Sequence, residues 1–255
     1  MCFMWQPFQH NGALKMKRTI AFLIFLILCI LPATGWTWHD ETHLAIAKAA
    51  GYNKWYNAAG ADITKIKAGN IENKNHYCNN APGNEVTAEM VLEQASRYNS
   101  PSDETGHLYG AIIQSIQEYR TTTKKGKYAE YHLAFCAHYV GDLSMPLHNT
   151  LYNAYNRKNH TVTDGTINDE VLDNLSKIRV YPIEIKSEGD LAKEVARIAN
   201  LSMKLGYQLE NEGRLLSKQE AYQQISHSAS LFKGILSWLK SEKKGIERCP
   251  QKLKF

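Results

Sequence analysis

The sequence lacks the cysteine pattern that builds thiolate metal sites. Its five cysteines stand at positions 2, 29, 78, 136 and 249, and no two of them form a C-x-x-C pair. A zinc site held by thiolates is therefore not expected. Cys136 lies in an apolar, helix-like stretch and is interpreted as an inert core thiol, so Cys78 with Cys249 is the internal disulfide left open.

The chain also lacks an apolar run long enough to cross a bilayer as a helix. The run from Ile20 to Leu31 has about 12 residues, whereas a transmembrane helix needs about 20. A Lys-Arg pair precedes this run, and Ala33 and Gly35 follow it, which is typical of a secretory signal peptide cleaved before Trp36. We expect an exported protein, periplasmic or extracellular, with a permanent membrane anchor as the alternative.

The predicted leader sets the domain organisation and the charge. Residues 1–35 are interpreted as an upstream extension and signal peptide, residues 36–245 as one folded domain, and residues 246–255 as a C-terminal tail. The leader contains three cationic residues and no acidic ones, so its removal lowers the formal charge from +5 to +2. The basic balance of the whole chain is thus a poor argument for nucleic-acid binding.

Apolar residues recur at three- and four-residue spacing in six segments, which is typical of amphipathic helices. These segments are 40–58, 87–98, 104–122, 127–143, 189–210 and 217–239. Only Arg179 to Ile185 (RVYPIEI) has an extended pattern, and one such stretch cannot make a sheet. The sequence predicts an all-α, single-domain bundle of several helices.

The most specific local motif is AHYVGDLSMPLH. His138 and Asp142 are four residues apart on a predicted helix and therefore share one face, and Pro146 ends the turn before His148. The surroundings are apolar, and a charged aspartate there must be paired or bound to metal to offset its desolvation. A buried His–Asp pair without metal is the alternative interpretation.

A second pair with the same spacing, His160 and Asp164, follows in NHTVTDG. Neutral imidazole and carboxylate suit zinc, and helical spacing of four residues gathers such ligands on one face. Two pairs joined by His148 are harder to attribute to chance than one. The pattern therefore favours a metal site.

Three further candidates lie upstream. His43 begins an apolar-periodic helix, and the segment between Asp62 and His76 can bring those two residues back to one point. Glu72, four residues before His76, is a rival to Asp62 as a ligand. Among the other histidines, His107 is expected to lie behind the site or at the surface, as is His132.

Taken in order, these residues resemble the ligand set of the zinc-dependent phospholipase C and single-strand nuclease superfamily, over nearly all of the mature chain. In that family an N-terminal Trp, a His, an Asp and a second His precede H-x3-D-x5-H and H-x3-[DE]. The matching positions here are Trp36 or Trp38, His43, Asp62, His76, His138, Asp142, His148, His160 and Asp164. The resemblance implies a helical bundle of the phospholipase C/nuclease type with a trinuclear zinc cleft.

The resemblance also implies how up to three zinc ions are held. One would be bound by Asp62, His76, His138 and Asp142, a second by His148, His160 and Asp164, and a third by the N-terminal Trp, His43 and a bridging Asp142. The implied reaction is cleavage of a phosphodiester by a metal-activated hydroxide. Asp62 and Asp142 are the catalytic candidates, and Asp62 is either a ligand or the general base.

Three functions remain open within this resemblance. The short step from His148 to His160 resembles the phospholipase branch, so we expect a phospholipase C-like enzyme acting on phospholipid head groups. We expect peripheral membrane contact and no obligate protein partner. Asp164 stands where phospholipases usually carry Glu and resembles the nuclease branch, which acts on single-stranded nucleic acid. A non-catalytic metal-binding protein is the third alternative; Tyr77 fits either substrate.

Overall fold

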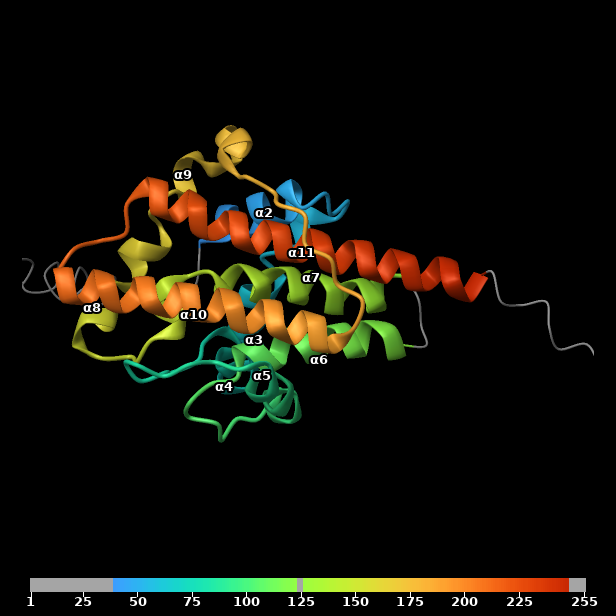
Figure 1. Cartoon of the computed structure of the whole chain (residues 1–255), viewed down its shortest axis with the longest axis horizontal. Coiled ribbons are helices and arrows are strands. Elements are labelled where there is room, and N and C mark those ends of the chain that lie inside the picture. The colour runs from blue at the N-terminus through green and yellow to red at the C-terminus, as the bar shows by residue number, and fades with distance from the viewer. Residues whose placement is uncertain (1–38, 123–125, 248–255) are drawn as a thin grey trace, which may run out of the picture. The chain divides into compact units, whose positions relative to one another are not determined.

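Helices make up all the regular structure of residues 39–122 and 126–247, which this computed structural model describes (Figure 1). No β-strand forms within those residues, so the predicted all-α class is confirmed. The α-helices are α2 (Asp40–Ala49), α3 (Gly60–Ala68), α4 (Asn70–Asn73), α5 (Ala88–Gln94), α6 (Leu108–Thr121), α7 (Lys127–Leu143), α8 (Ala154–Asp164), α9 (Asn168–Val171), α10 (Glu188–Glu212) and α11 (Lys218–Glu247). The 3-10 turns are η1 (Trp55–Asn57), η2 (Lys74–His76), η3 (Ala95–Arg97), η4 (Pro146–Asn149) and η5 (Leu172–Lys177).

The helix bounds follow the predicted segments with local differences. Helix α7 covers the predicted segment 127–143, and α10 matches its segment within two residues at each end. Helix α2 stops at Ala49, well short of the predicted residue 58. The reason lies at Gly51, whose φ of 84° is a conformation that ends a right-handed helix.

The extended segment Arg179 to Ile185 runs along helix α11 instead of pairing with a strand. The backbone N–H of Arg179 donates to Ser226 Oγ at 2.9 Å, and that of Tyr181 donates to Ser230 Oγ at 2.8 Å. The two serines are four residues apart and therefore share one face of α11. Their hydroxyl groups thus replace part of the hydrogen bonding that a neighbouring strand would supply.

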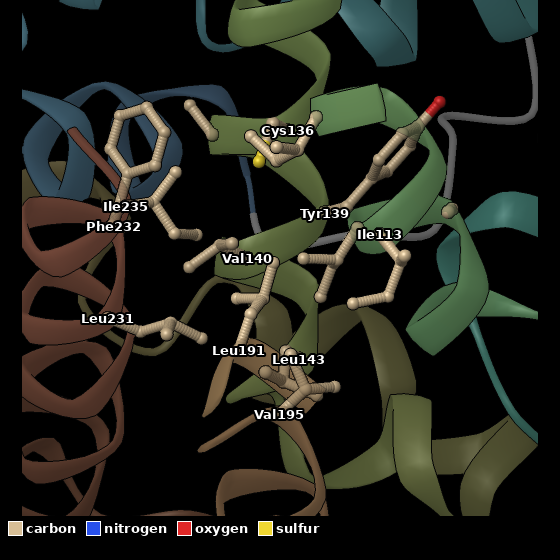
Figure 2. Packing of buried hydrophobic residues seen from close by; sticks show 14 of the residues in the cluster. Ile113, Cys136, Tyr139, Val140, Leu143, Leu191, Val195, Leu231, Phe232 and Ile235 are labelled. Atoms are coloured by element: carbon tan, nitrogen blue, oxygen red, sulfur yellow. The ribbon is translucent and has the colours of Figure 1, made fainter. Parts of the chain in front are cut away.

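The main hydrophobic core lies between α6, α7, α10 and α11 (Figure 2). Val140 of α7, Val195 of α10 and Phe232 of α11 are completely buried in it. Burying one such side chain stabilises the fold by about 1.5–3 kcal/mol. The long helices α10 and α11 lie along α7 and hold it in place (Figure 1).

Helix α7 divides its faces between the core and the functional residues. Cys136, Val140 and Leu143 point into the core (Figure 2), whereas His138 and Asp142 lie on the opposite side of the helix. Cys136 is fully buried, and burial raises the pKa of its thiol to about 12. The packed core therefore fixes the position from which the candidate ligands project.

Several sequence predictions concern residues outside the described ranges. These are the signal peptide, the choice between Trp36 and Trp38, and Cys249. Cys78 is buried and forms no disulfide with another described cysteine. Among the described residues, no helix combines the length and apolar character that a bilayer crossing requires.

Gly110 is expected to be essential for the packing of α6 against α5. A Cβ added there would lie 2.2 Å from the backbone carbonyl of Gln94, which cannot move without shifting the helix. Gly110→Ala should lower the free energy of unfolding by about 1–3 kcal/mol or more, measured by urea denaturation. Gly189→Ala is the control, because its Cβ would meet only Ser187 Oγ at 3.6 Å. An unchanged stability of Gly110→Ala would contradict this packing.

Candidate metal centre

Helix α7 places a histidine and an aspartate in the interior of the protein. His138 and Asp142 are both completely buried, and His138 Nε2 lies 3.4 Å from Asp142 Oδ2. The spacing of four residues brings them together on one helix face, as the sequence predicts. This pair is the part of the centre that local geometry determines.

Three other segments bring histidines to Asp142. His43 of α2 approaches Oδ1 through Nε2 at 3.4 Å, and His148 of η4 approaches the same oxygen through Nδ1 at 3.3 Å. The Nδ1 atom of His76 lies 2.8 Å from Asp142 Oδ2. Asp142 is therefore the point at which the candidate ligands from α2, η2, η4 and α7 meet.

Asp62 joins this group from helix α3. Its Oδ1 lies 3.6 Å from His138 Nε2, 3.9 Å from His76 Nδ1 and 3.2 Å from the ammonium of Lys65. The side chain of Asp62 is 19% exposed, which makes it the most accessible of the carboxylates in the centre. The structure thus brings Asp62, His76 and His138 together, a grouping that the resemblance implies.

The second predicted pair forms a neighbouring group with His148. His160 Nε2 lies 3.3 Å from Asp164 Oδ2 within α8, and 3.1 Å from His148 Nε2. Since His148 also faces Asp142, it connects this group to the first one. The candidate ligands therefore form one continuous centre.

Three groups in this centre could hold a metal ion, because their ligand atoms lie within 4.8 Å of one another. The groups are His43 with His138 and Asp142, Asp62 with His76 and His138, and His148 with His160 and Asp164. Several of their buried polar atoms have no hydrogen-bond partner among the described residues, including His43 Nε2, His138 Nε2 and both carboxylate oxygens of Asp164. Buried polar atoms are nearly always satisfied, so these atoms fit a metal-binding role.

Hydrogen bonds behind the rings select which nitrogen faces the centre. The Nδ1 atom of His138 donates to the carbonyl of Ala58 at 2.9 Å. In α8, His160 Nδ1 donates at 2.7 Å to Asn156 Oδ1, because the amide nitrogen of Asn156 is used in a 2.7 Å bond to Leu147 O. Both rings therefore turn Nε2 toward the centre, and a hydrogen bond from the other ring nitrogen to a neighbouring group is typical of metal-binding histidines.

Glu72, the rival of Asp62, lies behind His76. Its Oε1 is 3.4 Å from His76 Nε2, on the side of the ring away from Asp62 and Asp142, and it accepts a 2.7 Å hydrogen bond from Tyr139. Asn75 donates to the other carboxylate oxygen at 3.2 Å. Glu72 is therefore placed to orient His76, and neither it nor Tyr139 was predicted to do so.

The network continues through His107 to Asp103. His107 is completely buried, and its two ring nitrogens lie 2.8 Å from Asn75 Oδ1 and 3.0 Å from Asp103 Oδ2. His132 is half-buried and pairs with Glu118 through Nδ1 at 2.8 Å. Of these two histidines, His107 thus lies behind the centre and His132 near the surface.

The position of His43 depends on a glycine in α7, Gly141, because a larger residue there would occupy the space of the ring. The ring of His43 stacks on that of His138 with centroids 3.7 Å apart. A Cβ on Gly141 would lie 2.4 Å from His43 Nδ1, so only glycine leaves room for the ring. The sequence motif contains this glycine, yet its role depends on a contact with a distant helix.

The charge balance of the centre calls for a cation. Burial raises the pKa of Asp164 well above its ordinary range, and the negative charge of Asp142 adds to this effect. Burial, together with the neighbouring His43, lowers the pKa of His138 to about 3. For His76, burial and the charge of Lys65 would lower the pKa of the ring, but hydrogen bonds to Asp142 and Glu72 outweigh them and raise it. A bound metal ion would stabilise the ionised form of the buried Asp164.

A cavity of about 340 Å³ opens beside the second group. His148 and His160 form part of its wall, together with Leu147 and the aromatic rings of Tyr77 and Tyr152. A ligand in this cavity would touch both histidines. The geometry thus combines a candidate metal centre with a partly apolar binding space.

No protein-family model matches this sequence, and no curated protein matches it either. The function of the chain must therefore be inferred from the geometry of its own described residues.

Removing a ligand from α7 should reduce metal binding. His138→Ala and Asp142→Asn each delete an atom that faces at least two other candidate ligands, so the metal content of the purified protein should fall by about one ion or more per chain. Inductively coupled plasma mass spectrometry measures this, with His132→Ala as the control because His132 pairs with Glu118 instead. Unchanged metal content in both α7 variants would refute the centre.

Loss of the Glu72 carboxylate should weaken metal binding without deleting a ligand. Glu72→Gln removes the charge that orients His76, and loss of such a partner typically costs about 10–100-fold in metal affinity. Titration against a fluorescent chelator measures the change. Glu118→Gln, which alters a His–Glu pair outside the centre, should leave the affinity unchanged; an equal effect of both variants would argue against the orienting role.

Proposed function

We propose that this chain is a zinc-dependent phosphodiesterase of the phospholipase C type. The proposal rests on one observation: seven buried His and Asp side chains meet at one centre beside a cavity. They are His43, His76, His138, Asp142, His148, His160 and Asp164. Asp62, which is partly exposed, joins them. The proposal includes export of the protein, which rests on the leader-like sequence before Trp36.

The spacing of several ligand-atom pairs is compatible with zinc. Zinc bonds to histidine nitrogen and carboxylate oxygen are about 2.0–2.2 Å long, so tetrahedral ligand atoms lie roughly 3.3–3.6 Å apart. The His43–Asp142, His138–Asp62 and His160–Asp164 atom pairs are separated by 3.4, 3.6 and 3.3 Å. The donor set is all imidazole and carboxylate, which suits zinc, and it matches the ligand order of the phospholipase C/nuclease bundle.

Each part of the centre has a role in this proposal. Zinc bound here would supply Lewis-acid chemistry, which activates water and offsets negative charge on a phosphodiester. Asp142 faces histidines of several segments and is suited to connect two ions, while His148 and His160 orient the second group toward the cavity. The ring of His43 and an N-terminal tryptophan would hold a third ion.

The environment of Asp62 favours the ligand role over the general-base role. Burial alone would raise the pKa of Asp62, but His138, His76 and Lys65 outweigh it and hold the pKa well below the ordinary range. A carboxylate with such a low pKa accepts protons poorly near neutral pH. Its ion pair with Lys65 also places a cation at the centre, which would attract an anionic substrate.

The cavity is the specific observation that keeps the nuclease as a second candidate. Its two tyrosine rings, Tyr77 and Tyr152, could stack nucleobases as well as pack against a head group. The short step from His148 to His160 favours the phospholipase branch. A non-catalytic metal-binding protein is disfavoured because every ligand position described carries a competent residue.

Metal removal and replacement test this function directly. Dialysis against a chelator should lower hydrolysis of a soluble phosphodiester, bis-p-nitrophenyl phosphate, by roughly a hundredfold or more, and added zinc should restore it. His148→Ala should have a similar effect that zinc does not reverse, while His132→Ala should retain activity. Phosphatidylcholine and single-stranded DNA are then compared as substrates. Absence of zinc-restored hydrolysis of all three compounds would overturn the proposed function.

A further inference from the structure

Helices α3 and α4 expose large aliphatic side chains. Ile63 and Ile66 of α3 are 62% and 83% exposed, and Ile71 of α4 is 43% exposed. Isoleucine is among the residues most often buried, so three exposed isoleucines within nine positions form an unusual surface. Packing in the hydrophobic core does not explain why these side chains are apolar.

The exposed isoleucines begin one helical turn from the metal centre. Asp62 and Ile66 are four residues apart in α3 and therefore lie on the same side of the helix. Asp62 faces His138, whereas Ile66 extends into solvent. From α4, the chain continues to Asn73 and His76, which line the cavity beside the centre.

A second segment that borders the cavity also exposes apolar side chains. Leu151 is 38% exposed and Tyr152 is 44% exposed, in the segment between η4 and α8. Tyr152 and Asn73 line the same cavity, so the two segments that carry the exposed apolar side chains both border it. We define the rim surface as Ile63, Ile66, Ile71, Leu151 and Tyr152.

On the two segments that carry the rim surface, the charges are positive toward solvent and negative toward the interior. Lys67, Arg157 and Lys158 are exposed, and Lys74 is half-exposed. The only acidic residues of segments 60–76 and 146–160, both fully described, turn inward: the side chains of Asp62 and Glu72 are 19% and 5% exposed. This charge arrangement complements an anionic partner surface.

We propose that the rim surface docks the protein onto an anionic lipid bilayer, with the cavity facing the membrane. The inference rests on the proposed function, because it names the surface on which that centre would meet its substrate. A nucleic acid would be attracted by the same cations but offers no apolar phase in which aliphatic isoleucines gain by burial. Lipid satisfies both features, since isoleucines enter the head-group and acyl boundary while lysines remain with the phosphates.

Vesicle flotation of the full chain tests this docking. Vesicles of phosphatidylcholine with phosphatidylglycerol should bind the protein, and vesicles of phosphatidylcholine alone should bind it more weakly. The double variant Ile63→Ser/Ile66→Ser should reduce binding at least about tenfold, because it removes the two most exposed aliphatic side chains. Leu215→Ser is the matched control, since Leu215 is 44% exposed but lies in the loop between α10 and α11.

A charge variant gives an independent measurement. Lys67→Glu/Lys158→Glu should weaken binding to the anionic vesicles by about fivefold or more per lysine and should reduce its dependence on salt. Circular dichroism and thermal denaturation of each variant verify that the fold is retained. Both variants change exposed side chains, so both are expected to fold.

The outcomes separate the docking from the catalytic proposal. Loss of vesicle binding in the isoleucine variant, with binding retained in Leu215→Ser, supports the rim surface. Failure of the unmodified protein to bind vesicles, or equal binding by the isoleucine variant, would overturn it, as would preferential binding of a single-stranded oligonucleotide through the same residues. Hydrolysis of bis-p-nitrophenyl phosphate by the unmodified protein, measured without vesicles, reports on the proposed function separately.

Discussion

One buried carboxylate determines how the centre and the fold fit together. Asp142 is completely buried on α7, and nitrogen atoms of His43, His76 and His148 lie 2.8–3.4 Å from its oxygens. An ionised carboxylate in an apolar interior costs several kcal/mol unless it is paired. The segments that bring these histidines must therefore pack against α7, so the same contacts build the fold and the candidate metal centre.

Hydrogen-bond and ion-pair partners behind the candidate ligands hold their side chains in place. Hydrogen bonds to Ala58 and Asn156 orient His138 and His160, and Glu72 stands behind His76. Such partners lock ring orientation before a metal ion arrives, which reduces the entropy lost on binding. A centre that is already oriented in this way could bind a metal ion without rearranging its ligands.

Helix α3 serves the centre and the surface at once. Asp62 turns inward to the histidines, whereas Ile63 and Ile66 face solvent on the same short helix. In the proposed docking, α3 would lie at the membrane surface, and the cations beside it would face lipid phosphates. The proposed chemistry and the proposed docking therefore share one structural element, although different side chains carry them.

Local periodicity determined the helical class, the bounds of α7 and the two His–Asp pairs, because a spacing of four residues on a helix fixes which side chains share a face. The meeting of those pairs with His43 and Asp62 was predicted from a resemblance, and only the packing of α2, α3 and α7 decides the contacts. The contacts of Glu72 with Tyr139, of Gly141 with His43 and of His107 with Asn75 join segments distant in sequence, where periodicity carries no information. Exposure of Ile63 and Ile66 was likewise decided by tertiary structure, since an apolar residue in a helical pattern is ordinarily expected to face a core.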